Sequence, residues 1–336
     1  MARKGRRPAA AELAGLPVAV DAMGGDKAPA EIVAGARAAA DAGVPVVLVG
    51  PPAQVGDTAG LELVACTEVI AMDEDAGQAV RRKKDSSLVR SAELVRDGAA
   101  SAMVSAGNTG ATMASALLRM GRLPGVVRPC IATPLPRLGR TPAVLVDAGA
   151  NAECTPAMLA QFAQMGAAYV AARFGIAEPT VGLLSIGEEP NKGTPLVKEA
   201  HQLLSGAGVR FAGNVEGRDL LPSPVDVVVT DGFTGNVALK TLEGALRFFM
   251  ETLLGILGTD AATKAAGDTL MPHLLPVAAE LDPDNTGGAM LLGTDGVCVI
   301  SHGSSSAAAV TSAVRIAYEL AAGDLVGRLA SAVGPA

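Results

Sequence analysis

The stretch Val18-Ala-Val-Asp21-Ala-Met-Gly24-Gly25-Asp26-Lys-Ala-Pro29 indicates the fold class of this chain. A short apolar run stops at Asp21 and then at paired glycines, as a buried parallel strand stops at the carboxyl edge of an α/β sheet. The glycine pair permits positive φ and close backbone approach, and we expect Pro29 in the first turn of a helix. The stretch therefore predicts a strand, a ligand-binding turn flanked by Asp21 and Asp26, and a helix.

Short apolar runs and longer helical segments alternate along the rest of the chain. We expect strands near 17–21, 45–49, 101–105, 143–147, 180–185, 209–212, 225–230 and 296–300. We expect helices near 29–42, 87–97, 109–120, 156–173, 193–205, 236–258 and 304–322. The alternation predicts an α/β fold, a three-layer α/β/α sandwich with a mostly parallel, Rossmann-like sheet. The Pro-rich stretch 124–142 interrupts it with a hairpin that turns at Leu138-Gly-Arg140.

The segment from Val237 to Gly258 predicts an amphipathic helix, because its apolar residues recur at steps of three and four. These residues are Leu239, Leu242, Leu246, Phe249, Leu253 and Ile256. With the apolar cluster at 270–277, the helix predicts a helical protrusion over about 236–285, within a single domain spanning 16–336. Core packing or a dimer interface accounts for the stripe better than membrane contact, since cationic residues are sparse there.

Composition excludes several classes of protein. The 336 residues are 49% hydrophobic, enough for a large core, and 27 basic against 34 acidic residues give a net charge of −7. That balance argues against a nucleic-acid partner. The four widely spaced cysteines form no CxxC pair, so we expect reduced thiols in a cytosolic protein and no zinc site. Residues 1–15 are expected to be a basic disordered tail, since they lack the apolar core of a signal peptide.

Polar turns at the predicted strand ends are the candidate active-site residues, and in an open parallel sheet they would meet at one edge. Ser105-Ala-Gly-Asn-Thr-Gly110 and Ser301-His-Gly-Ser-Ser305 each precede a predicted helix, whose free amides attract anions. Either turn alone is simply a good helix N-cap. Two in one chain, with Asp147-Ala-Gly-Ala-Asn151 as a third polar turn, favour a phosphate-bearing ligand. Neither a Walker lysine motif nor GxGxxG is present, which disfavours nucleotides.

Four further features are candidates for chemistry. Lys192 opens a helix and suits charge stabilisation, and His302 suits proton transfer. Cys154 is a conceivable nucleophile without a neighbouring base. The run Arg81-Arg-Lys-Lys84 is either a solvated face or a docking patch for an acidic protein.

The motifs together resemble the bacterial acyl-carrier-protein:phosphate acyltransferases, the PlsX family. The resemblance is carried, in the family's order, by residues 18–29, 79–87, 105–110, 146–151, 186–189, 213–219, 231–236 and 301–305. It implies reversible transfer of a long-chain acyl group from acyl carrier protein to inorganic phosphate, giving acyl phosphate for phospholipid biosynthesis. It also implies no cofactor or metal, a cytoplasmic homodimer, weak peripheral membrane contact and a downstream glycerol-phosphate acyltransferase as a partner.

The resemblance also implies roles for residues. Lys192, Asn236 and His302 would be catalytic, and Arg81, Arg82, Lys83 and Lys84 would dock the carrier protein. Phosphate and substrate would be bound by Asp21, Gly24, Gly25, Ser105, Gly107, Asn108, Thr109, Gly110, Asn151, Asp231, Gly303, Ser304 and Ser305. Thr194 departs from the family, which usually has Asn there; its hydroxyl still suits a helix cap. Two alternatives stay open: a phosphotransacetylase-like enzyme using acyl-CoA, and a non-catalytic membrane-surface scaffold.

Overall fold

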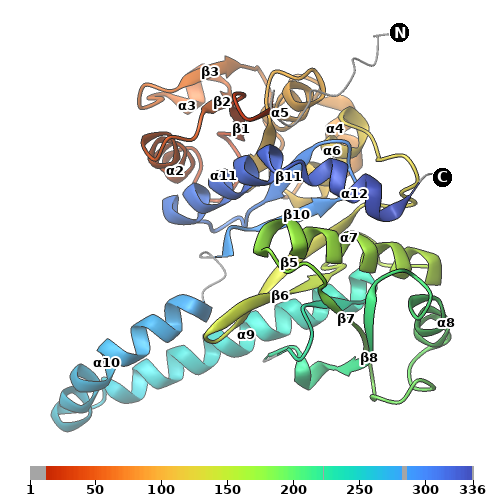
Figure 1. Cartoon of the computed structure of the whole chain (residues 1–336). Helices are drawn as coiled ribbons and strands as arrows, with labels where there is room; N and C mark the ends of the chain where they lie inside the picture. Colours follow the sequence, from red (N-terminus) through yellow and green to blue (C-terminus); the bar gives the residue numbers. More distant parts are fainter. Residues whose placement is uncertain (1–12, 222, 282–285, 335–336) are drawn as a thin grey trace.

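The computed structural model describes residues 13–221, 223–281 and 286–334. Its strands form a single eleven-stranded sheet in the order β3-β2-β1-β4-β11-β10-β5-β6-β9-β7-β8 (Figure 1). The strands are β1 (Val18–Asp21), β2 (Val46–Gly50), β3 (Glu62–Ala65), β4 (Ala102–Ser105), β5 (Cys130–Arg137), β6 (Arg140–Val146), β7 (Thr180–Ser185), β8 (Arg210–Glu216), β9 (Val227–Val229), β10 (Ala289–Leu292) and β11 (Val297–Ile300).

The sheet consists of two parallel blocks that run in opposite directions. In the first block, β3, β2, β1, β4 and β11 pair in parallel; in the second, β6, β9, β7 and β8 do so. Between them, β10 and β5 make three successive antiparallel pairings, which reverse the strand direction. The carboxyl ends of the two blocks therefore lie at opposite edges. The expectation that all polar turns meet at one edge is wrong.

Helices cover both faces of the sheet, which confirms the predicted sandwich. They are α2 (Ala30–Asp41), α3 (Pro52–Val55), α4 (Ala76–Arg82), α5 (Ser87–Arg96), α6 (Thr109–Arg119), α7 (Pro156–Phe174), α8 (Pro195–Leu204), α9 (Gly232–Leu257), α10 (Ala261–Leu281), α11 (Ala307–Ala322) and α12 (Leu325–Val333). Successive residues of β6 face two different hydrophobic cores, one on each face of the sheet. Val144 and Val146 belong to the core that α2, α7, α8, α11 and α12 cover, whereas Leu145 belongs to the core that α4, α5, α6 and α9 cover. This alternation follows from the two-residue period of a strand.

Helices α9 and α10 form the predicted protruding pair and extend away from the sheet (Figure 1). Helix α9 begins at Gly232, four residues before its expected start, because the Asp231 carboxylate accepts the Thr234 amide and caps it. Leu239 and Leu242 pack against the core. Farther along, Phe249 is 63% exposed. Core packing therefore accounts only for the first part of the apolar stripe.

Several other sequence expectations differ from the structure. Helix α11 begins at Ala307, three residues later than expected, because Ser306 and not Ser304 caps it. The predicted hairpin is present as β5 and β6, with Gly139 at a φ of 64°. Strands β3 and β10 and helices α3, α4 and α12 had no sequence expectation, since all are short. No described helix is long and apolar enough to cross a membrane.

The predicted tail, residues 1–15, lies mostly outside the described residues. Of its last three residues, Leu13 is buried. The Ala14 carbonyl accepts a hydrogen bond from the Tyr318 hydroxyl. The chain thus contacts the folded body from residue 13 onward.

Candidate active site

The turns after β1 and β4 form one polar cluster. Ser105 Oγ donates to Asp21 Oδ2 at 2.7 Å and accepts from the Gly107 amide at 3.0 Å. A Cβ at Gly24 would lie 2.7 Å from the Gly107 nitrogen, so only glycine allows the two turns to approach this closely. Burial raises the pKa of Asp21, although hydrogen bonds to the carboxylate oppose that rise. Asp21 therefore holds the turns together.

The turn after β11 joins this cluster. The Gly303 carbonyl accepts from the Asp26 amide at 2.8 Å, and Gly25 packs on it with a φ of 108°. The Ser301 amide donates to the Ser105 carbonyl, while Ser301 Oγ is buried with no partner in the described part of the chain. The sequence thus correctly grouped the turns of β1, β4 and β11.

The two helix N-termini at this cluster are not equivalent. At α11, the Ala307 amide donates to a carboxylate oxygen of Glu31 at 2.6 Å, so an acidic side chain already occupies that end. The expectation that a helix starts at residue 304 is wrong, whereas the phosphate-binding role of Ser304 and Ser305 stays a prediction. At α6, Asn108 caps through the Ala111 amide, and the amides of Thr109 and Gly110 have no acceptor among the described residues. The N-terminus of α6 therefore has free amides of the kind that accept an anion.

A second polar cluster surrounds Asp147, directly after β6. Its carboxylate accepts the amides of Ile131, Gly149, Ala150 and Asn151 and the Asn151 side-chain amide, at 2.8 to 3.2 Å. Burial is the largest influence on the pKa of Asp147 and raises it. Sequence reasoning singled out the turn that Asp147 opens but gave Asp147 itself no role, although an acid that opens an Asp-x-Gly turn is a recognisable signal.

The start of α9 closes over this second cluster. The Gly232 amide donates to the Asn151 carbonyl at 2.8 Å, and Asn236 Nδ2 donates to the Ala148 carbonyl at 3.3 Å. Asn151 and Asn236 therefore both lie in the second cluster, whereas the Asp231 carboxylate caps α9. Burial raises the pKa of the nearby Cys154 thiol to about 11, so it is protonated at neutral pH and a poor nucleophile.

Helix α9 links the two clusters. Lys240 Nζ lies 3.5 Å from His302 Nε2 and 2.8 Å from Glu243 Oε2. His302 Nδ1 accepts the Ser304 amide at 3.3 Å and lies 2.8 Å from Ser304 Oγ. Because Asn236 and Lys240 are four positions apart, they share one helix face. That face spans from the second cluster to the turn after β11.

The structure does not bring every predicted residue into these clusters. Lys192 is exposed in the loop after β7, at the same sheet edge as Asp147, and its side chain forms no hydrogen bond or ion pair with either cluster within the described residues. Thr194 caps α8 through the Val197 amide, as expected. Ser305 is buried, and its amide donates to the His302 carbonyl. Sequence reasoning missed Lys240, which on an amphipathic helix resembles an ordinary solvated lysine.

The basic run at 81–84 is divided between two environments. Lys83 Nζ donates to Glu74 Oε1 and the Val69 carbonyl, so it is a structural residue. Arg82 lines a depression with the acids Glu68, Glu74 and Asp75. Arg81 and Lys84 instead face a separate depression. Within the described residues, no group of three or more His, Cys, Asp or Glu side chains is placed to hold a metal ion.

Comparison with solved structures identifies the class of fold. A phosphotransacetylase from Streptococcus pyogenes superposes with a TM-score of 0.62 at 19% identity, covering 93% of this chain and 96% of that one. A branched-chain phosphotransacylase from Enterococcus faecalis gives 0.59 at 17% identity, covering 91% and 99%. The chain has the α/β fold of these enzymes.

Comparison of sequences identifies the family. The model described as "Fatty acid synthesis protein" matches residues 16–328. The phosphate acyltransferase of Elusimicrobium minutum is 48% identical over 313 residues, covering 90% of this chain and 92% of the relative. That of Myxococcus xanthus is 48% identical over 334 residues, covering 94% and 93%. The chain belongs to the fatty acid synthesis protein family and is a phosphate acyltransferase, as the motifs predicted.

Proposed function

We propose that the chain transfers a long-chain acyl group reversibly from acyl carrier protein to inorganic phosphate, and that the acyl phosphate supplies phospholipid synthesis. The observation that carries this proposal is the contact between Lys240 and His302. It joins two polar clusters from opposite sheet edges into one site, at which two reactants would be held together. The proposed donor is the carrier protein itself, and phosphate is the acceptor.

Phosphate binds at the α6 end of the site. The amides of Thr109 and Gly110 have no protein acceptor among the described residues, and the positive end of the helix dipole favours an anion. The Ser301 hydroxyl is buried without a hydrogen-bond partner among the described residues, and the Ser301 amide bonds to the Ser105 carbonyl in the same cluster. Lys240 supplies positive charge from the other side, next to His302. Gly24, Gly25 and Gly303 keep the turns close enough for backbone contact.

The reaction needs no covalent enzyme intermediate. An oxygen of hydrogen phosphate bonds to the thioester carbonyl carbon, whose oxygen becomes an oxyanion; the carbon–sulfur bond then breaks. The proton of hydrogen phosphate passes to the sulfur, which leaves as a thiol. His302 carries that proton, Asn236 orients the substrate or contacts the oxyanion, and Lys192 stabilises developing charge. Each step conserves atoms and charge without a metal or cofactor.

In this proposal, the protruding pair of helices α9 and α10 forms the dimer interface and contacts the membrane surface. Apolar side chains at least 40% exposed gather there: Phe248, Phe249, Leu254, Ile256, Leu270, Leu275 and Val277. A second copy of the chain covers part of this surface in a homodimer, and the remainder rests weakly on the cytoplasmic face of the membrane. A glycerol-phosphate acyltransferase that consumes acyl phosphate would then work at the same membrane surface.

Hydroxylamine trapping tests the proposed reaction. Palmitoyl carrier protein or palmitoyl-CoA is supplied with and without phosphate, and hydroxamate is measured. We expect phosphate-dependent hydroxamate from the carrier-protein donor and little from CoA. Product from CoA alone would favour the phosphotransacetylase-like alternative. No product from either donor, with the protein folded, would favour the scaffold.

A further inference from the structure

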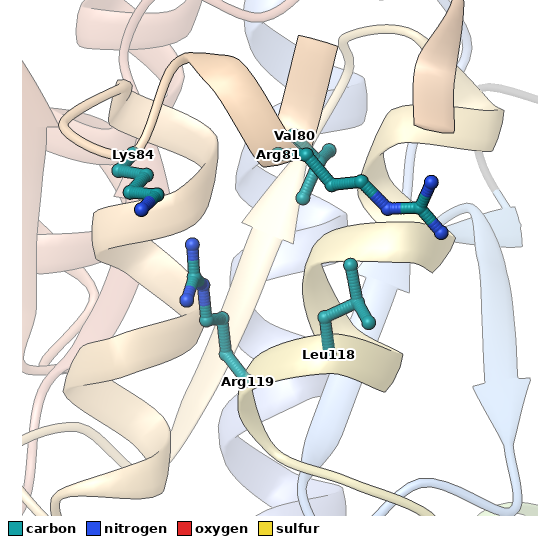
Figure 2. A pocket seen from close by; sticks show the side chains of 5 residues that line it. All are labelled: Val80, Arg81, Lys84, Leu118 and Arg119. Carbon is teal, nitrogen blue, oxygen red and sulfur yellow. The ribbon is translucent and has the colours of Figure 1, made fainter. Parts of the chain in front are cut away.

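A cationic surface with an apolar centre lies where α4 and α6 end. Arg81, Lys84 and Arg119 line a depression of about 370 Å³ with Leu118 and the buried Val80, and Leu118 lies between Arg81 and Arg119 (Figure 2). Leu118 is 53% exposed, although it belongs to an otherwise well-packed helix. We name these five residues the α4–α6 surface. Its combination of exposed leucine and cations is typical of a protein-docking site.

The positive charge of this surface is largely uncompensated. Neither Arg81 nor Lys84 forms an ion pair with an acid in the described part of the chain. Arg119 Nε lies 3.8 Å from Glu93 Oε1, but the same carboxylate also pairs with Arg90 and Arg96. Arg90 and Arg96 also pair with Asp85 and Asp97, so Arg119 alone among the three cations of the surface has an acid within ion-pair distance in the described residues. On a chain of net charge −7, this local excess of cations needs an explanation beyond solubility.

Helix geometry alone explains only part of the pattern. Arg81 and Arg119 lie in the last turns of α4 and α6, where cations offset the negative end of the helix dipole. The interaction with the helix dipole does not explain Lys84, because that residue lies beyond the end of α4. It also does not explain why an exposed leucine lies between the cations. The dipole therefore does not account for the apolar centre of the surface.

The α4–α6 surface is connected to the candidate active site by the two helices themselves. Asn108 caps α6, and its Nδ2 donates to the carbonyls of Met72 and Glu74 just before α4. Asp75 caps α4 through the Gln78 amide. Both helices thus start at the phosphate turn and end at the α4–α6 surface. The eleven residues of α6 separate the two places by about 16 Å.

We propose that the α4–α6 surface docks an acidic helix of the acyl carrier protein, with an apolar side chain of that helix on Leu118. This inference rests on the proposed function. A thioester on a long, flexible prosthetic arm suits the separation, because the protein body binds at one end of α6 while the arm reaches the other. Complementary charge raises the rate of encounter and sets the orientation of docking. Lys83 and Arg82, which have acidic neighbours, contribute little.

Charge reversal tests the docking surface. The variant Arg81→Glu/Lys84→Glu is compared with Lys198→Glu/Arg210→Glu, two exposed residues of α8 and β8 that give the same change in net charge. The donors are acyl carrier protein and acyl-pantetheine, which carries the thioester without the protein. We expect the first variant to raise KM for the carrier protein roughly tenfold or more, with kcat and acyl-pantetheine turnover within about twofold. Leu118→Ala should raise the same KM, and the control variant should change none of these values.

Each other result has a defined meaning. An unchanged KM for the carrier protein in Arg81→Glu/Lys84→Glu would overturn the docking surface. An equal loss of activity with the carrier protein and with acyl-pantetheine would also overturn it, because such a loss indicates damage to the site or the fold. Loss of binding to anionic lipid vesicles with an unchanged carrier-protein KM would assign the surface to lipid headgroups and also overturn it. A wild-type protein that makes no acyl phosphate from either donor contradicts the proposed function instead, before any variant is compared.

Discussion

Lys240 Nζ lies 3.5 Å from Nε2 of His302, although the two residues belong to opposite halves of the sheet architecture. Lys240 is on α9, which follows a strand of the second block, and His302 follows β11 in the first. Since the carboxyl ends of the blocks lie at opposite edges, the proposed single site depends on this contact. The contact also gives the protruding helix a direct connection to the proposed chemistry.

Replacing Lys240 should weaken the use of phosphate. In Lys240→Met, we expect kcat/KM for phosphate to fall roughly tenfold, because a positive charge beside the turn is lost. Lys240→Arg should keep most activity, and Lys264→Met on α10 should keep all of it. Steady-state kinetics with varied phosphate measure this effect. A Lys240→Met enzyme that behaves as wild type would remove α9 from the site.

Replacing Lys192 tests the residue that the structure leaves apart from both clusters. If Lys192 stabilises developing charge, Lys192→Ala should lower kcat about 100-fold, the scale of losing one oxyanion-stabilising group. The exposed Lys198 on the following helix provides the matched control, Lys198→Ala. Unchanged kcat in Lys192→Ala would show that this lysine is an ordinary surface residue.

Replacing Asp147 should destabilise the fold. In the wild type, backbone amides donate to both oxygens of the Asp147 carboxylate. In Asp147→Asn, an NH₂ group replaces one of these oxygens and cannot accept from a backbone amide. We therefore expect the free energy of unfolding to fall by about 3 kcal/mol. The control Asp231→Asn should cost less than about 1 kcal/mol, because asparagine caps helices as well as aspartate does. Urea denaturation compares the two. Equal small losses would contradict the supporting role of Asp147.

Asp21 should make stability depend on pH in the direction opposite to an ordinary carboxylate. Burial raises its pKa in the folded protein above the ordinary 3.8. Its contribution is therefore complete below pH 3.8 and is lost as pH rises through the raised folded value. Relative to Asp21→Asn, which does not titrate, the wild type should lose about 1.36 kcal/mol per pH unit within that window.

Urea denaturation of wild type and Asp21→Asn between about pH 4 and 7 measures the difference. A difference in unfolding free energy that grows in favour of the wild type as pH rises would mean that hydrogen bonds outweigh burial at Asp21.

The sequence predicted those parts of the site that lie within contiguous turns. The turns of β1, β4 and β11 are correctly grouped because each follows an apolar run of a parallel block. The reversal between the blocks depends on β10, which is four residues long and pairs both with the adjacent β11 and with β5, far earlier in the chain. Because the sequence does not predict β10, it also does not predict that the turn at Asp147 lies at the sheet edge opposite the turns of β1, β4 and β11.

Two local details were likewise beyond the sequence pattern. Three serines in a row, Ser304, Ser305 and Ser306, are equally good caps, and tertiary contact of Glu31 with Ala307 marks where α11 starts. Lys240 has the spacing of a solvated residue on α9, and only the packing of that helix across the sheet brings it to His302. Function thus depends on long-range contacts that local periodicity does not record.

The most direct test of the account is phosphorus NMR of the purified protein with palmitoyl carrier protein and inorganic phosphate. We expect an acyl phosphate resonance that grows as the inorganic phosphate resonance falls, with one free carrier thiol released for each acyl phosphate formed. Thiol release without a new phosphorus resonance would mean that water accepts the acyl group. That result would contradict the account of this chain as an enzyme that places phosphate against a carrier-bound thioester.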